Sequence, residues 1–436
     1  MRHFLTLITL LGFALQASAQ QTNVWSLQEC IDYAHEHNLE IQMRQVYIDR
    51  QETALNTAQN KRLPNLTAGA SHSYSFGRSA SGFDNTYQDR NSMSTQWSAN
   101  TSVPLFTGFM ITNEIAANKL DLLSVTAELE KVKQDMEISI TSMYLQILYY
   151  REILGIAKLQ TELSREQLDR TRKLLESERA SEALIYEVEA LIANDELSVV
   201  QAASDLKMAI LTLTQALELP SPEGFDVVEP DDAVDFFLAR QPDAIYESAL
   251  TSRASIRAEE LRLLSNEKYI LMAKSALYPS LSFGAGYSNN YYTINGFENP
   301  SLSNQLKNNR NEYFGLNLQI PIFNRYSTRN SIKTAQLNLQ LQELQLENTK
   351  KTLYKEIQQA FYNALTSAEK FKAAEAAYAS AEKSFGFMKE KLENGYATMY
   401  EYNDSKTAMT RALSNRTQAK YDFIIRKKIL QFYEQQ

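Results

Sequence analysis

The sequence predicts an α+β membrane protein, in which a shared transmembrane β-barrel with four strands per chain continues into a long α-helical coiled-coil barrel. Three observations predict this class. Long segments rich in charged residues, alanine and leucine contain none of the nine prolines, so nothing interrupts them as helices. Four short segments alternate apolar and small polar residues, as strands do. The same arrangement occurs twice, which predicts two internal structural repeats.

The first residues have the features of an export signal. Arg2 precedes an apolar run at 4–15, and Ala-Ser-Ala at 17–19 provides a cleavage pattern. We therefore expect a signal peptide at 1–19. Beyond it, no apolar stretch is long enough for a transmembrane helix, which needs about 20 residues.

The second half of the chain repeats the first at an offset close to 215 residues. Leu63-Pro64-Asn65-Leu66 recurs as Tyr278-Pro279-Ser280-Leu281, and Val-Pro-Leu-Phe at 103–106 recurs as Ile-Pro-Ile-Phe at 320–323. A nearly constant offset over such a distance indicates a duplicated half rather than a solenoid. The predicted segments are a first repeat at 20–219, a proline-rich acidic linker at 220–242 and a second repeat at 243–436.

Each repeat is predicted to run helix, strand, loop, strand, very long helix, turn and helix. The predicted helices are 27–62, 108–178 and 183–219 in the first repeat, and 243–277, 325–393 and 398–432 in the second. At 1.5 Å per residue the long helices would reach roughly 100 Å. A spacing of seven predicts a coiled-coil seam in the last long helix. The seam residues are Phe371, Tyr378, Phe385 and Leu392.

Each predicted strand has one apolar, aromatic-containing face and one face of small uncharged polar residues. The strands are expected at about 66–77, 93–104, 281–292 and 313–321. Their lengths suit tilted membrane-spanning strands, and the long polar loops between them favour a membrane barrel over a soluble sheet. The polar residues expected to face a water-filled lumen include Ser71, Ser73, Ser98, Asn100, Ser282 and Asn317.

Four strands are too few to close a barrel, because the smallest barrels have about eight. An open sheet edge in lipid would leave backbone groups without hydrogen bonds, which is too costly. The barrel must therefore be shared between two, three or four copies of the chain. An open pore favours three or more.

The sequence carries no recognisable catalytic or cofactor motif, so we expect no enzyme, no cofactor and no metal site. His35 and His37 lie on different faces of a predicted helix. Cys30 is the single cysteine and is expected to be a small apolar residue on a helix face. The formal net charge of −8 argues against nucleic acid as a partner.

With these features in place, the chain resembles the TolC family of outer-membrane efflux proteins over essentially its whole length. The resemblance rests on Pro64 and Pro279 before strands, on the motifs at 103–106 and 320–323, and on the stretch 395–426. It implies a homotrimer in outer-membrane lipid with a large periplasmic portion. It also implies a periplasmic adaptor and an inner-membrane transporter of the resistance-nodulation-division or ABC type, in tripartite efflux or type I secretion.

The resemblance further implies a periplasmic gate made of carboxylates just after a glycine-containing helical turn. Glu401 and Asp404 follow Gly395 and match those positions. Their i, i+3 spacing puts both on one helix face, and a ring of such acids favours cations. The alternative is two solvated acids at a helix end. In the first repeat Ala180 stands where the glycine is expected, and possible gate neighbours are Tyr186, Glu187 and Glu189.

Two other functions stay open at this point. A trimeric autotransporter-like surface adhesin also combines a coiled coil with four strands per chain, but its strands form one C-terminal block. A periplasmic coiled-coil scaffold would need no alternating strands. The strand pairs here lie far apart in the chain, which argues against the adhesin, and the four alternating strands argue against the scaffold.

Overall fold

The computed structural model describes residues 23–80, 86–89, 91–229 and 240–434, so the predicted signal peptide at 1–19 lies outside the described residues. The chain forms two compact units. Of the described residues, unit 1 comprises those up to Gln45, those within Glu128–Ile256 and those from Thr349 onward, and unit 2 comprises those within Val46–Ala127 and Arg257–Asn348. Each unit contains segments from both halves of the sequence. The division into units therefore does not follow the predicted repeats, and the repeat boundaries at 219 and 243 stay a prediction.

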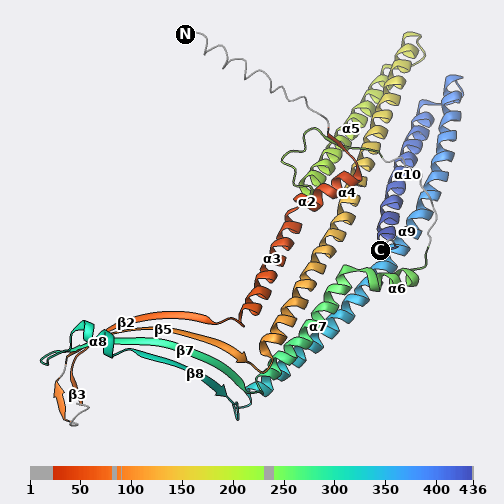
Figure 1. Ribbon diagram of the computed structural model, residues 1–436. Coiled ribbons are helices and arrows are strands. Elements are labelled where there is room, and N and C mark those ends of the chain that lie inside the picture. Colours follow the sequence, from red (N-terminus) through yellow and green to blue (C-terminus); the bar gives the residue numbers. More distant parts are fainter. Residues whose placement is uncertain (1–22, 81–85, 90, 230–239, 435–436) are drawn as a thin grey trace, which may run out of the picture. The chain divides into compact units, whose positions relative to one another are not determined.

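Unit 2 contains an antiparallel four-stranded sheet in the order β2-β5-β7-β8 (Figure 1). The strands are β2 (Asn65–Ser75), β5 (Ser92–Phe106), β7 (Ser280–Ile294) and β8 (Asn311–Gln319). The central β5–β7 pair joins the two halves of the chain. β2 and β8 are the two edges, and each is shorter than the central strands.

The predicted loop at 293–312 is not structureless, since it contains the short helix α8 (Leu302–Asn308). Gln305 of α8 is buried, and its side chain makes the two backbone hydrogen bonds to Tyr292 that a neighbouring strand would otherwise make. The Tyr292 backbone N–H donates to Gln305 Oε1 at 2.9 Å, and Gln305 Nε2 donates to the Tyr292 carbonyl at 2.7 Å. These two bonds satisfy the backbone N–H and carbonyl of Tyr292, which lies in the part of β7 that extends beyond β8. The loop at 78–92 holds a small hairpin of β3 (Arg78–Ala80) and β4 (Tyr87–Asp89).

The helices of unit 2 lie side by side in the order α3, α4, α7, α9 (Figure 1). They are α3 (Leu39–Asn60), α4 (Met110–Glu176), α7 (Ala254–Ser275) and α9 (Ser327–Glu393), of which α4 and α9 continue into unit 1. Hydrogen bonds connect each neighbouring pair. They join Gln51 to Asn118, Tyr269 to Asp121, and Gln342 to Glu259.

In unit 1 the helices run in the order α5, α4, α10, α9, with α5 at Glu182–Ala216 and α10 at Met399–Glu434. The shorter α2 (Leu27–His37) and α6 (Pro242–Ser252) also belong to this unit. The predicted seam of α9 packs as expected. Phe371 and Phe385 are buried, and the Phe385 ring lies 5.4 Å from that of Tyr402 on α10.

The predicted linker at 220–242 is in part an ordered strand. β6 (Phe225–Val227) pairs in parallel with β1 (Asn23–Trp25). Phe225 and Val227 are buried in the core of unit 1, which also contains Cys30. Burial of these two apolar side chains explains why the segment folds onto the helices instead of connecting the halves freely.

The predicted helices at 27–62 and 243–277 are each broken in two, at Asn38 and Arg253. Neither break has a proline or glycine. Instead, each residue reaches the end of another helix: Asn38 Nδ2 donates to the Ala216 carbonyl at 3.0 Å, and Arg253 Nη2 donates to the Phe432 carbonyl at 2.9 Å. Carbonyls at a helix end lack partners within their helix, so these bonds stabilise the ends of α5 and α10.

Candidate functional site

All six polar strand residues predicted from the sequence lie on one face of the sheet. Residues opposite each other on antiparallel strands point to the same side. The register pairs Ser71 with Gln96, Ser98 with Ser288, and Ser282 with Asn317. Ser73 and Asn100 share this face because they are two residues from Ser71 and Ser98. The sheet therefore has one continuous face of small polar residues.

The opposite face is apolar and strongly exposed in the single chain. Leu66 is 78% exposed and Phe314 is 83% exposed. Val103 pairs with Phe283, which pairs in turn with Leu316. A row of large exposed apolar side chains calls for an apolar environment such as lipid or another protein surface.

The polar face is closely packed at one row. Tyr313 lies opposite Gly286, and its hydroxyl donates to Asn100 Oδ1 at 3.2 Å. A Cβ atom at Gly286 would lie 2.5 Å from both Asn100 Oδ1 and Tyr313 Cε1. Only glycine leaves room for the tyrosine ring to cross β7 here.

Two helical turns end the hairpins α4–α5 and α9–α10 at the same end of unit 1 (Figure 1). After α9, Gly395 has a φ of 78°, and after α4, Glu178 has a φ of 57°. Similar hydrogen bonds close both turns: Tyr396 N–H donates to Lys391 O, and Arg179 N–H donates to Leu174 O, each at 2.8 Å. The residue of the first turn that corresponds to Gly395 is therefore Glu178, not Ala180 as the sequence predicted. Glu178 adopts the left-handed conformation although it is not a glycine.

The two predicted gate acids have different surroundings. The backbone N–H and the hydroxyl of Thr398 both donate to Glu401 Oε2 at 2.8 Å, and Glu401 N–H donates back to Thr398 Oγ1 at 3.3 Å. This is a capping box at the start of α10, and its hydrogen bonds lower the pKa of Glu401. Asp404 is exposed and has no partner among the residues that the structure describes. The pattern Thr-x-x-Glu was readable in the sequence.

The possible gate neighbours lie in the first turns of α5. Tyr186 is 68% exposed, and Glu187 is exposed as well. Glu189 is paired with Arg172 of α4 at 3.4 Å. Both acids are exposed, and of the two only Glu189 forms an ion pair among the described residues.

A buried polar cluster below the second turn was not predicted. Lys406 of α10 is fully buried, and its Nζ donates to Ser164 Oγ of α4 at 2.6 Å. The Ser164 hydroxyl donates in turn to the Asp195 carboxylate of α5. Burial lowers the pKa of Lys406, and the Asp195 charge opposes this shift. The Ser164 hydroxyl thus connects residues from three helices.

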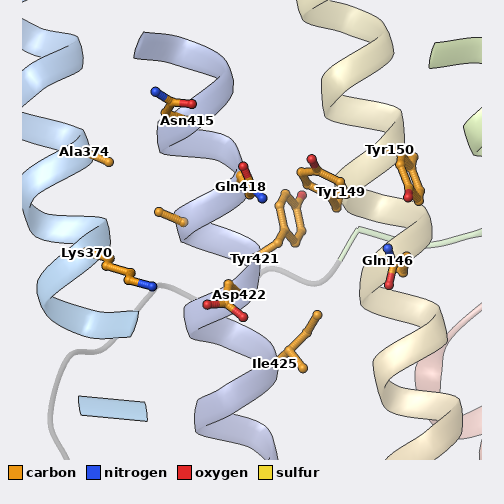
Figure 2. A pocket seen from close by; sticks show the side chains of 11 residues that line it. Gln146, Tyr149, Tyr150, Lys370, Ala374, Asn415, Gln418, Tyr421, Asp422 and Ile425 are labelled. Carbon is orange, nitrogen blue, oxygen red and sulfur yellow. The ribbon is translucent and has the colours of Figure 1, made fainter. Parts of the chain in front are cut away.

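An open groove of about 670 Å³ crosses unit 1 between α4, α9 and α10 (Figure 2). Three tyrosines and several polar side chains line it, among them Tyr149, Tyr150, Tyr421, Lys370, Gln418 and Asp422. The described residues include no group of three or more His, Cys, Asp or Glu that could hold a metal ion. In the described part of the chain, no helix is long and apolar enough to cross a membrane.

Comparison with known proteins places this geometry in a family context. The family model described as outer membrane efflux protein matches residues 30–218 and 245–432. The outer membrane protein TolC of Salmonella enteritidis is 22% identical over 433 residues, which is 95% of this chain and 83% of the relative.

Solved structures share the fold. A membrane protein from Pseudomonas aeruginosa superposes with a TM-score of 0.78 at 15% identity, covering 93% of both chains. The outer membrane protein VceC from Vibrio cholerae gives a TM-score of 0.76 at 14% identity, covering 94% of this chain and 96% of that one.

Proposed function

This chain belongs to the outer membrane efflux protein family and is an outer-membrane efflux channel with a large periplasmic portion, and on that premise we propose that it works as a homotrimer. Three four-stranded sheets would close one barrel in the membrane. The helical hairpins would continue it as an α-helical barrel in the periplasm. Substrates would pass from the periplasmic end through both parts to the exterior.

The observation that carries this proposal is the open sheet with two unlike faces. β2 and β8 are edge strands, and an open edge in lipid leaves backbone groups without partners. Pairing β8 of one copy with β2 of the next would satisfy both edges. The polar face would then line a water-filled lumen, and the apolar face would contact outer-membrane lipid.

The outer helices of each unit support a ring of copies. In unit 1, α5 exposes Leu197, Val200 and Met208; in unit 2, α9 exposes Leu337, Leu341 and Leu344. Apolar stripes of this kind mark surfaces that another chain covers. The matching helix breaks at Asn38 and Arg253, 215 residues apart, support the duplication of the chain.

Glu401 and Asp404 are proposed to form the periplasmic constriction, with Tyr186, Glu187 and Glu189 as possible neighbours. Three copies of the α10 turn would bring its acids around one axis. A ring of carboxylates attracts cations and repels anions. All these residues lie in the first turns of α10 and α5, next to the turns that close the two hairpins, and this supports the role.

The proposed partners are a periplasmic adaptor and an inner-membrane transporter of the resistance-nodulation-division or ABC type. The family is one of channels rather than enzymes, and a channel without a motor needs a transporter to drive export. This places the chain in tripartite efflux or type I secretion. A surface adhesin or a periplasmic scaffold is not favoured, because β5 and β7 from the two halves pair in one sheet.

Thiol labelling of outer membranes tests the proposal. On a Cys30→Ala background, Ser71→Cys and Ser282→Cys should react with a water-soluble thiol reagent. The matched variants Tyr74→Cys and Phe283→Cys point to the other face and should be protected by lipid. An unheated gel should show an oligomer for each variant. Equal labelling of both pairs would rule out the polar face as the lumen.

A further inference from the structure

A pocket of about 370 Å³ lies at the end of the sheet that is remote from the helices of unit 2 (Figure 1). β2 and β7 each begin just after a helix, α3 or α7, so their last residues, Ser75 and Ile294, mark this remote end. The residues that line the pocket include Tyr74, Phe76, Asn91, Met93, Asn295 and Phe297. With the helices in the periplasm, this end of the sheet lies at the outer leaflet of the membrane.

The pocket opens on the apolar face of the sheet. Tyr74 pairs with Met93, which pairs in turn with Thr293, so these three side chains form one row on one face. Tyr74 follows Leu66 by eight residues, and an even spacing along a strand keeps both side chains on the same face. The pocket is therefore continuous with the surface that contacts lipid in the proposed function.

An ordered row of aromatic rings forms one wall of the pocket. His72 Nδ1 lies 2.8 Å from Thr95 Oγ1, and this hydrogen bond fixes the imidazole ring. The Tyr74 ring packs edge-to-face against His72 with the ring centres 4.8 Å apart, and the Phe76 ring is nearly parallel to that of Tyr74, 6.4 Å away. Tyr74 is nevertheless 62% exposed and Phe76 is 77% exposed. Both rings are held by neighbours and remain largely uncovered.

The loop after β7 forms a second wall, which hydrogen bonds also fix. Asn299 Oδ1 accepts from the Ile294 N–H at 2.8 Å, and Asn299 Nδ2 donates to the carbonyls of Ile294 and Phe297. The Asn295 N–H donates to the Asn91 carbonyl at 2.9 Å, which ties the loop to the start of β5. The side-chain amides of Asn91 and Asn295 are exposed and have no partner among the residues that the structure describes.

The chemistry of the lining restricts what can occupy the pocket. None of its residues carries a charge, so a phosphate or a cation would lose water without gaining a counter-charge. A hydrocarbon chain would leave the amides of Asn91 and Asn295 without hydrogen bonds. A neutral sugar satisfies both parts of the lining. Its C–H faces stack on aromatic rings, and its hydroxyl groups donate and accept as amides do.

We propose that this pocket binds the neutral sugar head group of a glycolipid in the outer leaflet. The inference rests on the proposed function, because it takes the apolar face of the sheet as the lipid-facing one. Tyr74 and Phe76 stack on the sugar ring, and Asn91 and Asn295 hydrogen-bond its hydroxyl groups. The acyl chains lie along the apolar face, which is why the source is a lipid and not a free sugar. The pocket volume lies within the range of about 300–1,000 Å³ that small-molecule sites occupy.

Lipid retention by the purified full-length oligomer tests this proposal. The protein is placed in micelles of a detergent without a sugar head group, with equal amounts of a glucosyl diacylglycerol and a phosphatidylcholine of the same acyl chains. Native mass spectrometry then counts the lipids that stay bound. The glucosyl lipid should be retained roughly tenfold in excess, because only its head group can use both walls of the pocket.

Two substitutions and a matched control locate the binding. Phe76→Ala removes a stacking ring and Asn295→Ala removes a hydrogen-bonding amide, so each should reduce the excess by about threefold to tenfold. Phe314→Ala is the control, because Phe314 is an equally exposed ring on the apolar face that does not line the pocket. The control should leave the excess unchanged.

Several outcomes would overturn the proposal. Equal retention of both lipids by the wild-type protein would mean that the acyl chains alone account for binding. A loss in Phe314→Ala as large as in Phe76→Ala would indicate unspecific lipid contact. Competition by soluble methyl glucoside at the concentration of the glucosyl lipid would make the ligand a free sugar. Loss of the oligomer on unheated gels in both pocket variants would assign the pocket to a contact between copies.

The test also separates this inference from the proposed channel. If Phe76→Ala alone fails to form the oligomer, Asn295→Ala decides, and an unchanged excess in that variant refutes the sugar site. In that case the channel still stands as long as thiol labelling distinguishes Ser71→Cys from Tyr74→Cys. Equal labelling of these two variants would remove the lipid-facing surface itself, and the proposed function and the sugar site would then fail together.

Discussion

Lys406 and Asp195 are connected through a single hydroxyl, that of Ser164, which accepts from the ammonium group and donates to the carboxylate. Lys406 and Ser164 are fully buried, and Asp195 is 7% exposed. Each charge therefore depends on the other to offset its loss of water. The three residues come from α10, α4 and α5, so the contact fastens the second hairpin to the first.

Lys406→Met should destabilise the protein by about 3 kcal/mol, because it leaves Asp195 buried without a counter-charge. Lys406→Met combined with Asp195→Leu should recover most of this loss. Chemical unfolding of the detergent-solubilised protein, with limited proteolysis of α10 as a local probe, measures both. If the losses of the two single variants simply add in the double variant, the two residues are not coupled.

Glu187→Gln should weaken multivalent-cation block in planar bilayers in the same direction as Asp404→Asn. Glu187 is exposed and lies nine residues after Glu178, the residue of positive φ in the first turn, just as Asp404 lies nine residues after Gly395 in the second. Glu189→Gln is the matched control, since Glu189 is already paired with Arg172. A larger effect of the control than of Glu187→Gln would contradict the correspondence between the hairpins.

Gly286→Ala should destabilise the sheet by about 1–3 kcal/mol through overpacking. The added methyl group would lie 2.5 Å from Tyr313 Cε1 and from Asn100 Oδ1, so the hydrogen bond between these two side chains would be lost. Gly315→Ala on β8 is the control, because a Cβ atom there meets nothing within 4 Å. The temperature at which the unheated gel band converts to monomer should fall for Gly286→Ala only.

The two faces of the sheet were predictable because a period of two is a strong local signal. Ser71, Ser98 and Asn317 lie on one face in the structure as the alternation indicates. The seam of α9 was predictable for the same reason. Its apolar residues recur every seven positions from Phe371 to Phe385, and this repeat can be recognised without knowing the partner helix.

What sequence reasoning missed depends on contacts between distant residues. β1 and β6 have three residues each, too few to show alternation, and they pair only because Phe225 and Val227 are buried in a core made elsewhere. The break between α2 and α3 lies at Asn38, whose side chain donates to the carbonyl of Ala216, 178 residues further along the chain. Glu178 adopts a positive φ without being glycine, so no residue type marked the first turn.

Tyr144 of α4 is buried next to β1 and β6. Its ionisation predicts how the stability of unit 1 changes at alkaline pH. Its hydroxyl lies 2.5 Å from the Val228 carbonyl and 3.1 Å from that of Trp25, so its single proton is shared between them. Burial raises the pKa of Tyr144 to about 12, with smaller contributions in the same direction from Cys30 and Glu29 and an opposing one from Arg151. The neutral phenol is thus favoured in the folded state.

Because the folded pKa of Tyr144 lies above the value of about 10 for an unfolded tyrosine, its contribution to stability is complete below pH 10 and is lost as the pH rises towards 12. The full contribution is about 2–3 kcal/mol. Tyr144→Phe cannot ionise and should lose about 1 kcal/mol at neutral pH from the missing hydrogen bond. Its stability should then fall less steeply above pH 10. Trp25 fluorescence on a Trp97→Phe background, where it is the only tryptophan, follows unfolding at this position. The same alkaline loss in Tyr144→Phe as in its parent would show that Tyr144 is not the titrating group.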